Sequence, residues 1–583
     1  MGASSIKDTS SRIIDPIGNR MRITRQTGWV CLATLCSAAV MAAGMSLVTA
    51  PAQAAFELPE GERITDVLVI GRAIPQKEAY ELYDPNIGKN FDLKNFWMRA
   101  DLRVRPEMRN NACFGNTFST TSAGSCNDSA ANTGTKGKNN DFFVQQMVRL
   151  GIGYDLSPDV NFYMELIDSR NWGGNGATGV GNGGNVDATN QNGGTTSAGA
   201  FSSALGVRAA YVLVRNLASV QGLSMKAGRQ YIVFGSQSLF GHFDWANTGF
   251  SHDGVMFQYS TKAFDTYFGW IRTAETDLAQ AAAVGSGGNN IAGSQTGNGN
   301  ADGNMLIFYN QIKLVPGLLI EPYYTYYKNG LGGQTADFSA ANNQGLGTPK
   351  HPNQTRHMIG NRFEVRKGNF DAQNEISYQF GAMGDNGGAN VGTGNQKNLH
   401  INAWATRSWI GYTHYQSAWK PRLAFNFDYA SGDGRANCTS AAGAGTGCQS
   451  ANTFENFFPT NHVHMGYMDV QAWKNMLSPS VNFQFRPSAD DHVEFWYTNL
   501  NLASSKDNWY RGGQGVYVYS QVGNTKTHIG DELDVAWTHM FADGKLVFQA
   551  SYGHLWPGSY IAQNLAGKAV GQDWAYAQLW MNF

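Results

Sequence analysis

Arginine side chains at alternate positions are the groups of this sequence best placed to do specific chemistry. Between Met98 and Arg109, charged residues occupy every second position, and mainly apolar residues fill the positions between them. In an extended strand this alternation collects the charged groups on one face, whereas a helix would scatter them. A guanidinium stays ionised and donates two parallel hydrogen bonds to a carboxylate or phosphate. The pattern therefore predicts recognition of anionic groups rather than bond-making chemistry.

The same reasoning applies to arginines in other segments with a strand-like pattern. We expect the following to line a water-filled interior: Arg99, Arg103, Arg105, Arg149, Arg208, Arg229, Arg362, Arg366, Arg407 and Arg422. A passage for solutes needs a wet, charged interior and no catalytic group. The alternative is that each arginine pairs with an interior acid, such as Asp101, Glu364 or Asp428, and braces the protein. Both interpretations stay open for any single arginine.

Two segments rich in aromatic residues are candidates for narrowing this interior. In residues 231–252 the candidates are Phe240, Phe243 and Trp245, and in residues 454–469 the candidate is Phe458. These loops either fold inward, where they would constrict a passage or stack on sugars, or pack against neighbouring loops at the rim. His462 and His464 lack a clear third ligand, so we predict no metal site and no cofactor.

The elements that position these residues are predicted to be β-strands. Charged residues make up only 15% of the chain, against about 25% in an average soluble domain, while aromatic residues reach 12%. Alternating apolar and polar residues recur in about eighteen segments of about 8–14 residues, which is close to the length of a tilted strand that crosses a bilayer. We therefore predict an all-β fold, a transmembrane antiparallel β-barrel of about eighteen strands.

The connections between these segments alternate between short and long. Short connections lie at 156–159, 315–317, 367–369, 487–491 and 542–544. Long connections, rich in Gly, Asn, Ser and Ala, lie near 110–140, 171–204, 274–302, 328–354, 381–399, 431–475 and 502–527. Short periplasmic turns opposite long extracellular loops are the arrangement expected of outer-membrane barrels.

The N-terminal region has the features of a secretory signal peptide. Basic residues (Arg20, Arg22 and Arg25) precede an apolar stretch at 29–48, and Ala52-Gln53-Ala54 provides a cleavage pattern. We assign residues 1–54 to the signal peptide, with Met21 as an alternative start, residues 55–92 to a periplasmic extension and residues 93–583 to the barrel. A transmembrane anchor is the less favoured interpretation of the apolar stretch, because it is short and rich in Ala.

The end of the chain and the net charge indicate location and partners. The final segment ends at Phe583 on the outward face of a strand, which resembles the signal read by the outer-membrane assembly machinery. We therefore expect a protein of the bacterial outer membrane that contacts outer-membrane lipid and this machinery. The formal charge of −1 gives no basic excess, so we expect no nucleic-acid partner.

Four cysteines outside the signal peptide form two close pairs in the sequence. Cys113 and Cys126 lie in one long connection, and Cys438 and Cys448 lie in another. In an oxidising compartment each pair is predicted to form a local disulfide.

Three stretches of the sequence resemble the alginate-export family of outer-membrane barrels. They are Ala227 to Gln230 with Phe234-Gly235, Gly241, Asp244 to Thr248 and Asp253-Gly254; Asp428 to Asp433 with Thr453-Phe454, Phe457 to Thr460 and Gly466 to Asp469; and Gly530 to Asp534 with Gly553 to Gly558. The resemblance implies an eighteen-stranded barrel with an arginine-rich pore, which in the namesake exports an anionic polysaccharide.

The function expected from these features is a channel for polar, anionic solutes. Removal of residues 1–54 takes five of the 43 basic and two of the 44 acidic residues, which leaves 38 and 42, so anion selectivity does not follow from net charge. A polysaccharide exporter would need periplasmic polysaccharide-synthesis components as partners. A general diffusion porin and a non-conducting adhesion or structural barrel are the alternatives. No nucleophile with a base is marked by spacing, so we expect no enzymatic activity.

Overall fold

The computed structural model describes residues 95–582, except for 116–139, 174–205, 248, 275–302, 330–353, 385–397, 435–449, 515, 519–522 and 566–568. The predicted signal peptide and periplasmic extension lie outside this range. The strands are β1 (Phe96–Asn110), β2 (Asp141–Ser157), β3 (Val160–Gly173), β4 (Gly206–Val214), β5 (Leu223–Gln230), β6 (His252–Ser260), β7 (Phe264–Ala274), β8 (Gly303–Val315), β9 (Leu318–Asn329), β10 (Gln354–Lys367), β11 (Phe370–Gly384), β12 (Asn398–Thr413), β13 (Arg422–Ala430), β14 (Ser450–Ala451), β15 (Met476–Phe485), β16 (Asp491–Leu502), β17 (Trp509–Tyr510), β18 (Val516–Val518), β19 (His528–Phe541), β20 (Leu546–Pro557) and β21 (Gln572–Asn582). The short helical elements are η3 (Leu217–Ser219), η7 (Asn461–Val463) and α4 (Ser559–Asn564).

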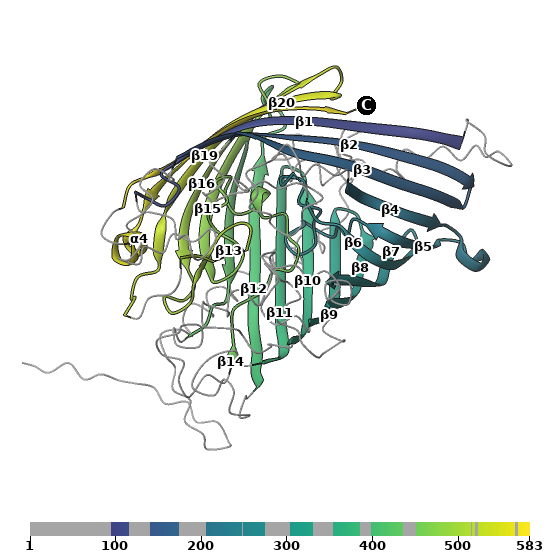
Figure 1. Cartoon of the computed structure of the whole chain (residues 1–583), viewed down its shortest axis with the longest axis horizontal. Coiled ribbons are helices and arrows are strands. Elements are labelled where there is room, and N and C mark those ends of the chain that lie inside the picture. Colours follow the sequence, from purple (N-terminus) through teal and green to yellow (C-terminus); the bar gives the residue numbers. More distant parts are fainter. Residues whose placement is uncertain are drawn as a thin grey trace, which may run out of the picture. The chain divides into compact units, whose positions relative to one another are not determined.

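The long strands form one closed antiparallel barrel. Each strand pairs with the next one along the chain, and Figure 1 shows successive strands side by side. The ring closes because β1 pairs with β2 on one edge and with β21 on the other, where Asp101 lies opposite Asn582. In the described part of the chain the barrel has 18 strands, which confirms the predicted fold class. The two-residue β14 and the β17–β18 pair are additional.

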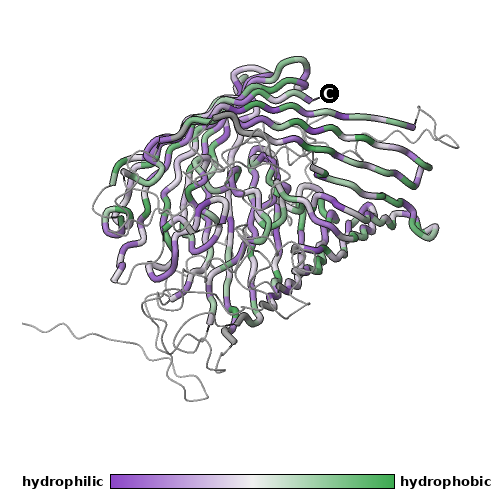
Figure 2. Tube along the Cα trace, viewed as in Figure 1, coloured by the Kyte–Doolittle hydropathy of each residue, from purple (hydrophilic) through white to green (hydrophobic). Residues whose placement is uncertain are grey.

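Burial along the strands follows the alternation read from the sequence. In β1 the residues from Asp101 to Arg109 alternate regularly between buried and half-buried positions, and Asp101, Arg103, Arg105 and Glu107 are all buried. The apolar residues between them face outward, and Met98 near the start of the strand is 59% exposed. Figure 2 shows the same alternation as changing colours along the strands. The barrel therefore has a largely apolar outer face for lipid and a polar interior.

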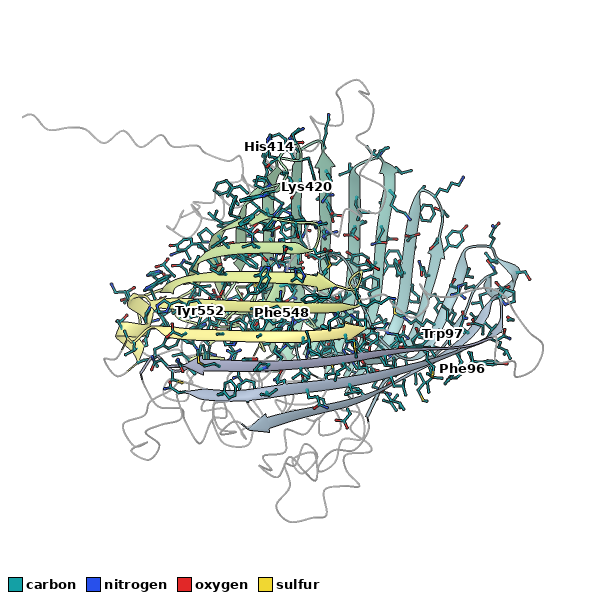
Figure 3. All side chains as sticks on the ribbon, turned by 90° about the horizontal axis from the view of Figure 1, so that it is seen from above. Phe96, Trp97, His414, Lys420, Phe548 and Tyr552 are labelled. Carbon is teal, nitrogen blue, oxygen red and sulfur yellow. The ribbon has the colours of Figure 1, made fainter. Side chains whose placement is uncertain are left out.

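The connections also follow the predicted alternation of short and long. Two-residue turns at 158–159, 316–317 and 368–369 join β2 to β3, β8 to β9 and β10 to β11. Gly317 has a φ of 76°, a left-handed conformation that glycine adopts without strain. Figure 3 labels His414 and Lys420 at the connection between β12 and β13, and Phe548 and Tyr552 along β20. No helix among the described residues is long and apolar enough to cross a membrane.

Two of the long connections fold into the barrel. Residues 231–251, between β5 and β6, contact residues 454–465 through a backbone bridge that joins Phe240 to Phe458, and a second bridge joins Phe240 to Phe234 within the first segment. Both segments also contact inward-facing residues of the wall: Ser238 donates to Glu375 on β11, and Gln379 donates to the carbonyl oxygen of residue 455 at 2.6 Å. Polar contacts to wall residues therefore hold both segments inside the ring. Cys113 is disulfide-bonded, while the predicted partner Cys126, and both Cys438 and Cys448, lie outside the described residues.

Candidate functional site

Four inward-facing arginines surround the loop segment 242–247. Arg103 and Arg105 come from β1, Arg149 from β2 and Arg208 from β4, and all four side chains are buried. We call them the arginine cluster. Their spacing follows from the strand pattern: residues two apart on one strand, and opposed residues on neighbouring strands, share the inner face.

The arginine cluster holds the loop through its backbone oxygens. Arg103 donates to the carbonyl oxygens of Asp244 and Trp245, the latter at 3.2 Å, and to Oδ1 of Asn247 at 2.9 Å. Arg105 donates to the same Trp245 oxygen at 2.8 Å. Carbonyl oxygens carry only partial charge, so the loop does not neutralise Arg103, whereas Arg105 also lies 3.5 Å from the Glu107 carboxylate.

Asp244 provides the loop's own anionic anchor. Its carboxylate lies 2.7 Å from Nη1 of Arg149 and 3.1 Å from Nη2 of Arg208. Burial opposes ionisation of Asp244, but Arg149, then His242 and Arg208, more than offset it, so the pKa of Asp244 lies well below its ordinary value. The carboxylate is therefore ionised at neutral pH and ties the loop to β2 and β4.

Trp245 joins the two inward segments. The guanidinium of Arg105 lies 3.5 Å from the Trp245 ring centroid, and the His462 ring stacks on Trp245 with centroids 3.6 Å apart. Burial lowers the pKa of His462, although Asp469 at 3.1 Å opposes the shift, so the imidazole is neutral at pH 7. Trp245 thus lies between one cation from the wall and one neutral ring from the second loop.

The other aromatic candidates lie in the same inner region. Phe240 and Phe458 are buried and joined by their backbone bridge. Phe243 is half-buried and stacks on Phe250 with ring centroids 5.4 Å apart. The structure therefore brings Phe240, Phe243 and Phe458 together with Trp245 on two segments that lie within the ring.

Several of the other predicted arginines pair with acids of the wall. Arg362 binds Glu321 and Glu364. Arg422 makes a two-point contact with Asp371 at 2.9 and 2.6 Å. These pairs are the bracing arrangement that the sequence left open as an alternative.

Three further candidates also lie on the inner face. Arg407 lies 3.4 Å from Asp428 and donates to the His464 carbonyl oxygen at 3.2 Å. Arg99 lies 3.0 Å from Asp101, and Arg366 is buried on the inward face of β10. The contacts of Arg99 and Arg407 with acids join residues of the barrel wall to one another. Arg407 also joins the wall to the second inward segment.

Arg229 is not part of the inner group. It lies opposite Asp253 on β6, and its Nε and Nη2 atoms each donate to that carboxylate at 2.8 Å. The side chains of Arg229 and Asp253 are 39% and 54% exposed, and they lie on the outward face of the barrel. Arg229 is therefore not one of the arginines that line the interior.

Sequence reasoning missed other inward charged residues. Arg356 is buried on β10 and donates to Gln379 at 2.6 Å, and its place in the alternation of β10 could have revealed it. Lys474 and Glu455 form a buried ion pair at 2.7 Å, and both lie in the irregular connection between β14 and β15. No pattern in the sequence marks that pair, because the chain there has no regular period.

Two acidic groups of separate connections meet next to the second inward segment. The Asp433 amide donates to the Asp507 carboxylate at 3.0 Å, and the Asn452 amide donates to the Asp433 carboxylate at 2.6 Å. Burial, and then the nearby Asp507 carboxylate, raise the pKa of Asp433 to about 7. In the described part of the chain, no group of three or more His, Cys, Asp or Glu side chains is arranged to hold a metal ion.

Comparison with known proteins identifies the family. The model of the alginate export family matches residues 121–572, which is most of the chain. No curated protein sequence matches the chain significantly.

Two solved structures have a similar outline at low sequence identity. OccK9 (OpdG) from Pseudomonas aeruginosa has 9% sequence identity, a TM-score of 0.46, and coverage of 84% of this chain and 99% of its own. OccAB1 from Acinetobacter baumannii has 10% identity, a TM-score of 0.45, and coverage of 84% and 97%.

Proposed function

Because this chain belongs to the alginate export family, we propose that its barrel is a channel for anionic solutes, with carboxylate-bearing polysaccharide as the substrate class. Family membership and the closed barrel place the protein in the bacterial outer membrane. The observation that carries the proposal is the arginine cluster on one sector of the inner wall. As an exporter, the protein would receive its substrate from periplasmic polysaccharide-synthesis components.

The charge balance of this sector favours anions. On the inner faces of β1 to β4 and in the loop that they hold, six arginines meet five carboxylates: Arg99, Arg103, Arg105, Arg109, Arg149 and Arg208 against Asp101, Glu107, Asp155, Glu165 and Asp244. The excess is one positive charge, and it lies near Arg103, which binds neutral loop oxygens, while Arg105 lies 3.5 Å from Glu107. Because these guanidinium groups are buried, they act on a passing carboxylate through their electric field rather than by direct contact.

The inward loop supports the choice of a sugar chain over a simple ion. Trp245 lies between the Arg105 guanidinium at 3.5 Å and the stacked His462 ring at 3.6 Å, so an aromatic ring whose two faces are covered adjoins a cation, and only its edge is open to a sugar. A uronic-acid unit presents the matching pair of features, an apolar ring face and a carboxylate. We propose that Trp245, together with Phe240, Phe243 and Phe458 of the same two inward segments, forms the constriction where such units pass.

A general diffusion porin for small polar solutes is the second candidate. It is favoured by the ion pairs that Arg362 forms with Glu321 and that Arg422 forms with Asp371. In each pair the carboxylate neutralises the charge of the arginine within the wall. In that case the lumen would select by size more than by charge, and uronic-acid chains would have no special affinity.

Ion selectivity in planar bilayers tests the proposal. We expect the mature protein to conduct with anion preference, and the double substitution Arg103→Glu and Arg105→Glu to move the reversal potential toward cations. The matched control reverses two exposed lysines near the short turns, Lys367→Glu and Lys545→Glu, and should leave the reversal potential unchanged. Uronic-acid oligomers should block the wild-type current and block the inner double variant less. A silent wild-type protein, or a reversal potential unmoved by the inner pair, would contradict the proposal.

A further inference from the structure

An outward-facing row of polar side chains crosses β5 to β9 at the end of the barrel that carries the long connections. The strand register places its members directly opposite one another: Arg229 opposite Asp253, Asp253 opposite Arg272, Arg272 opposite Asn304 and Asn304 opposite Lys328. We call these five residues the rim row. All five lie on the face that elsewhere carries exposed apolar residues such as Phe268 and Phe308.

The rim row is positively charged. It contains three cationic side chains and one carboxylate, a net of two positive charges, and Lys328 is exposed while Arg272 is half-buried. Asp253 holds Arg229 by two hydrogen bonds of 2.8 Å, which fixes the direction of that guanidinium. Charges on the outer surface of a barrel are unfavourable against hydrocarbon but suit the headgroup level.

Aromatic side chains mark the level of the row relative to the membrane. Trp270 is 40% exposed and lies two residues before Arg272, at the adjacent outward position of β7. Its indole nitrogen donates to Asn304 at 3.1 Å. The Arg272 guanidinium lies 5.6 Å from the Trp270 ring centroid. Two strands further on, Tyr324 bonds His357 at 2.8 Å on the same outward face. Such rings collect at the membrane–water interface, so the rim row lies at the outer headgroups.

The other side of the same rim has the opposite character. On β19 and β21 the outward positions near the long connections are Asp531 and Asp573. Asp531 accepts hydrogen bonds from Asn499 at 2.7 Å and Tyr497 at 2.8 Å, and Asp573 accepts one from Tyr552 at 2.7 Å. The basic character is therefore a local property of β5 to β9 and not a feature of the whole circumference.

We propose that the rim row binds the phosphate groups of an outer-leaflet glycolipid. Neighbouring strands are about 4.8 Å apart, so Arg229 to Arg272 and Arg272 to Lys328 are each separated by about 10 Å at the backbone. That separation is comparable to the length of a disaccharide. A glycolipid with phosphates at both ends of a disaccharide, the chemistry of lipid A, can therefore place each phosphate against a different cation while its acyl chains cover Trp270, Phe268 and Phe308.

Native mass spectrometry of the full mature barrel in detergent tests this proposal. The probes are diphosphoryl lipid A, monophosphoryl lipid A and inorganic phosphate. The test variant is Arg272→Gln with Lys328→Gln, which leaves the Arg229–Asp253 pair intact. The control variant, Lys313→Gln with Lys367→Gln, removes two lysines near the short turns at the opposite end of the barrel.

We expect diphosphoryl lipid A to bind the wild type and the control equally, and to bind the test variant at least about tenfold more weakly. Monophosphoryl lipid A should bind the wild type less well than the diphosphoryl form. The charge-preserving variant, Arg272→Lys with Lys328→Arg, should restore most of the affinity, and a heat-modifiable gel shift checks that each variant folds.

Three results would overturn the proposal. The first is equal binding of diphosphoryl lipid A by the test variant and the wild type. The second is equal binding of both lipids by the wild type, which would indicate that the second phosphate makes no contact with the rim row. The third is displacement of the lipid by inorganic phosphate at similar concentration, which would indicate an anion site without lipid specificity.

Discussion

Replacement of Asp244 by Asn should loosen the inward loop without changing the barrel wall. The substitution keeps the size of the side chain and removes the charge that meets Arg149 at 2.7 Å and Arg208 at 3.1 Å. Loss of one partner of a buried ion pair costs about 3–5 kcal/mol. Arg149 retains Asp101 at 3.2 Å, and Arg208 retains the His242 carbonyl oxygen at 2.9 Å, so the lower end, about 3 kcal/mol, is appropriate.

The expected consequence is a change in channel behaviour rather than in folding. Since each 1.4 kcal/mol is a factor of ten, the population with segment 242–247 detached should rise about 100-fold. Single-channel recordings should then show more frequent transitions to states of higher conductance. The control Asp265→Asn removes a carboxylate from a partly exposed pair with Lys313, worth about 0–1 kcal/mol, and should leave the recordings unchanged. A folded Asp244→Asn barrel with wild-type conductance and noise would refute the argument that Asp244 anchors the loop.

Three further predictions concern stability. Because the pKa of Asp433 is raised to about 7, the folded state holds a proton that the unfolded state releases near pH 4, so the contact with Asp507 should weaken as pH rises from about 4 to 7. Amide exchange, corrected for its intrinsic pH dependence, should therefore show less protection at pH 8 than at pH 5. The substitution Asp507→Asn should flatten this difference in protection. Gly235→Ala places a side chain at a φ of 54° and should cost about 1–2 kcal/mol, which would be visible as greater protease sensitivity of the inward loop. Arg422→Ala leaves Asp371 buried without its cation and should cost about 3–5 kcal/mol, measured as a lower temperature for loss of the folded gel band.

The wall of the barrel was predictable because its residues repeat with period two. In β1, charged residues alternate with residues that are mostly apolar, and the buried and half-buried positions follow the same alternation. In β5, Leu223, Met225 and Ala227 alternate with Ser224, Lys226 and Gln230, and Arg229 falls on the apolar face, so the alternation itself places Arg229 outward and the prediction that it lines the interior was wrong. A shift of one residue reverses the face of every side chain in a strand, and the structure places Arg229 outward.

The interior was not predictable in the same way. Arg103 and the Asp244 carbonyl oxygen are separated by 141 residues in the sequence, and they meet only because the ring brings β1 and the loop together. The aromatic content of segment 231–252 suggested two locations, and nothing in its composition distinguished them. Contacts of an irregular segment depend on the surface that receives it, which local periodicity does not describe.

The seam between β1 and β21 has a consequence for biogenesis. Until β21 is in place, the chain presents two unsatisfied edges, each with a line of free amide and carbonyl groups able to recruit any other strand. The pairing that removes both edges joins residues as far apart as Asp101 and Asn582, so it is a late event. A chain that stalls before β21 is in place would therefore not be a partial channel. It would be an open sheet with unpaired edge strands, prone to pair with strands of other chains.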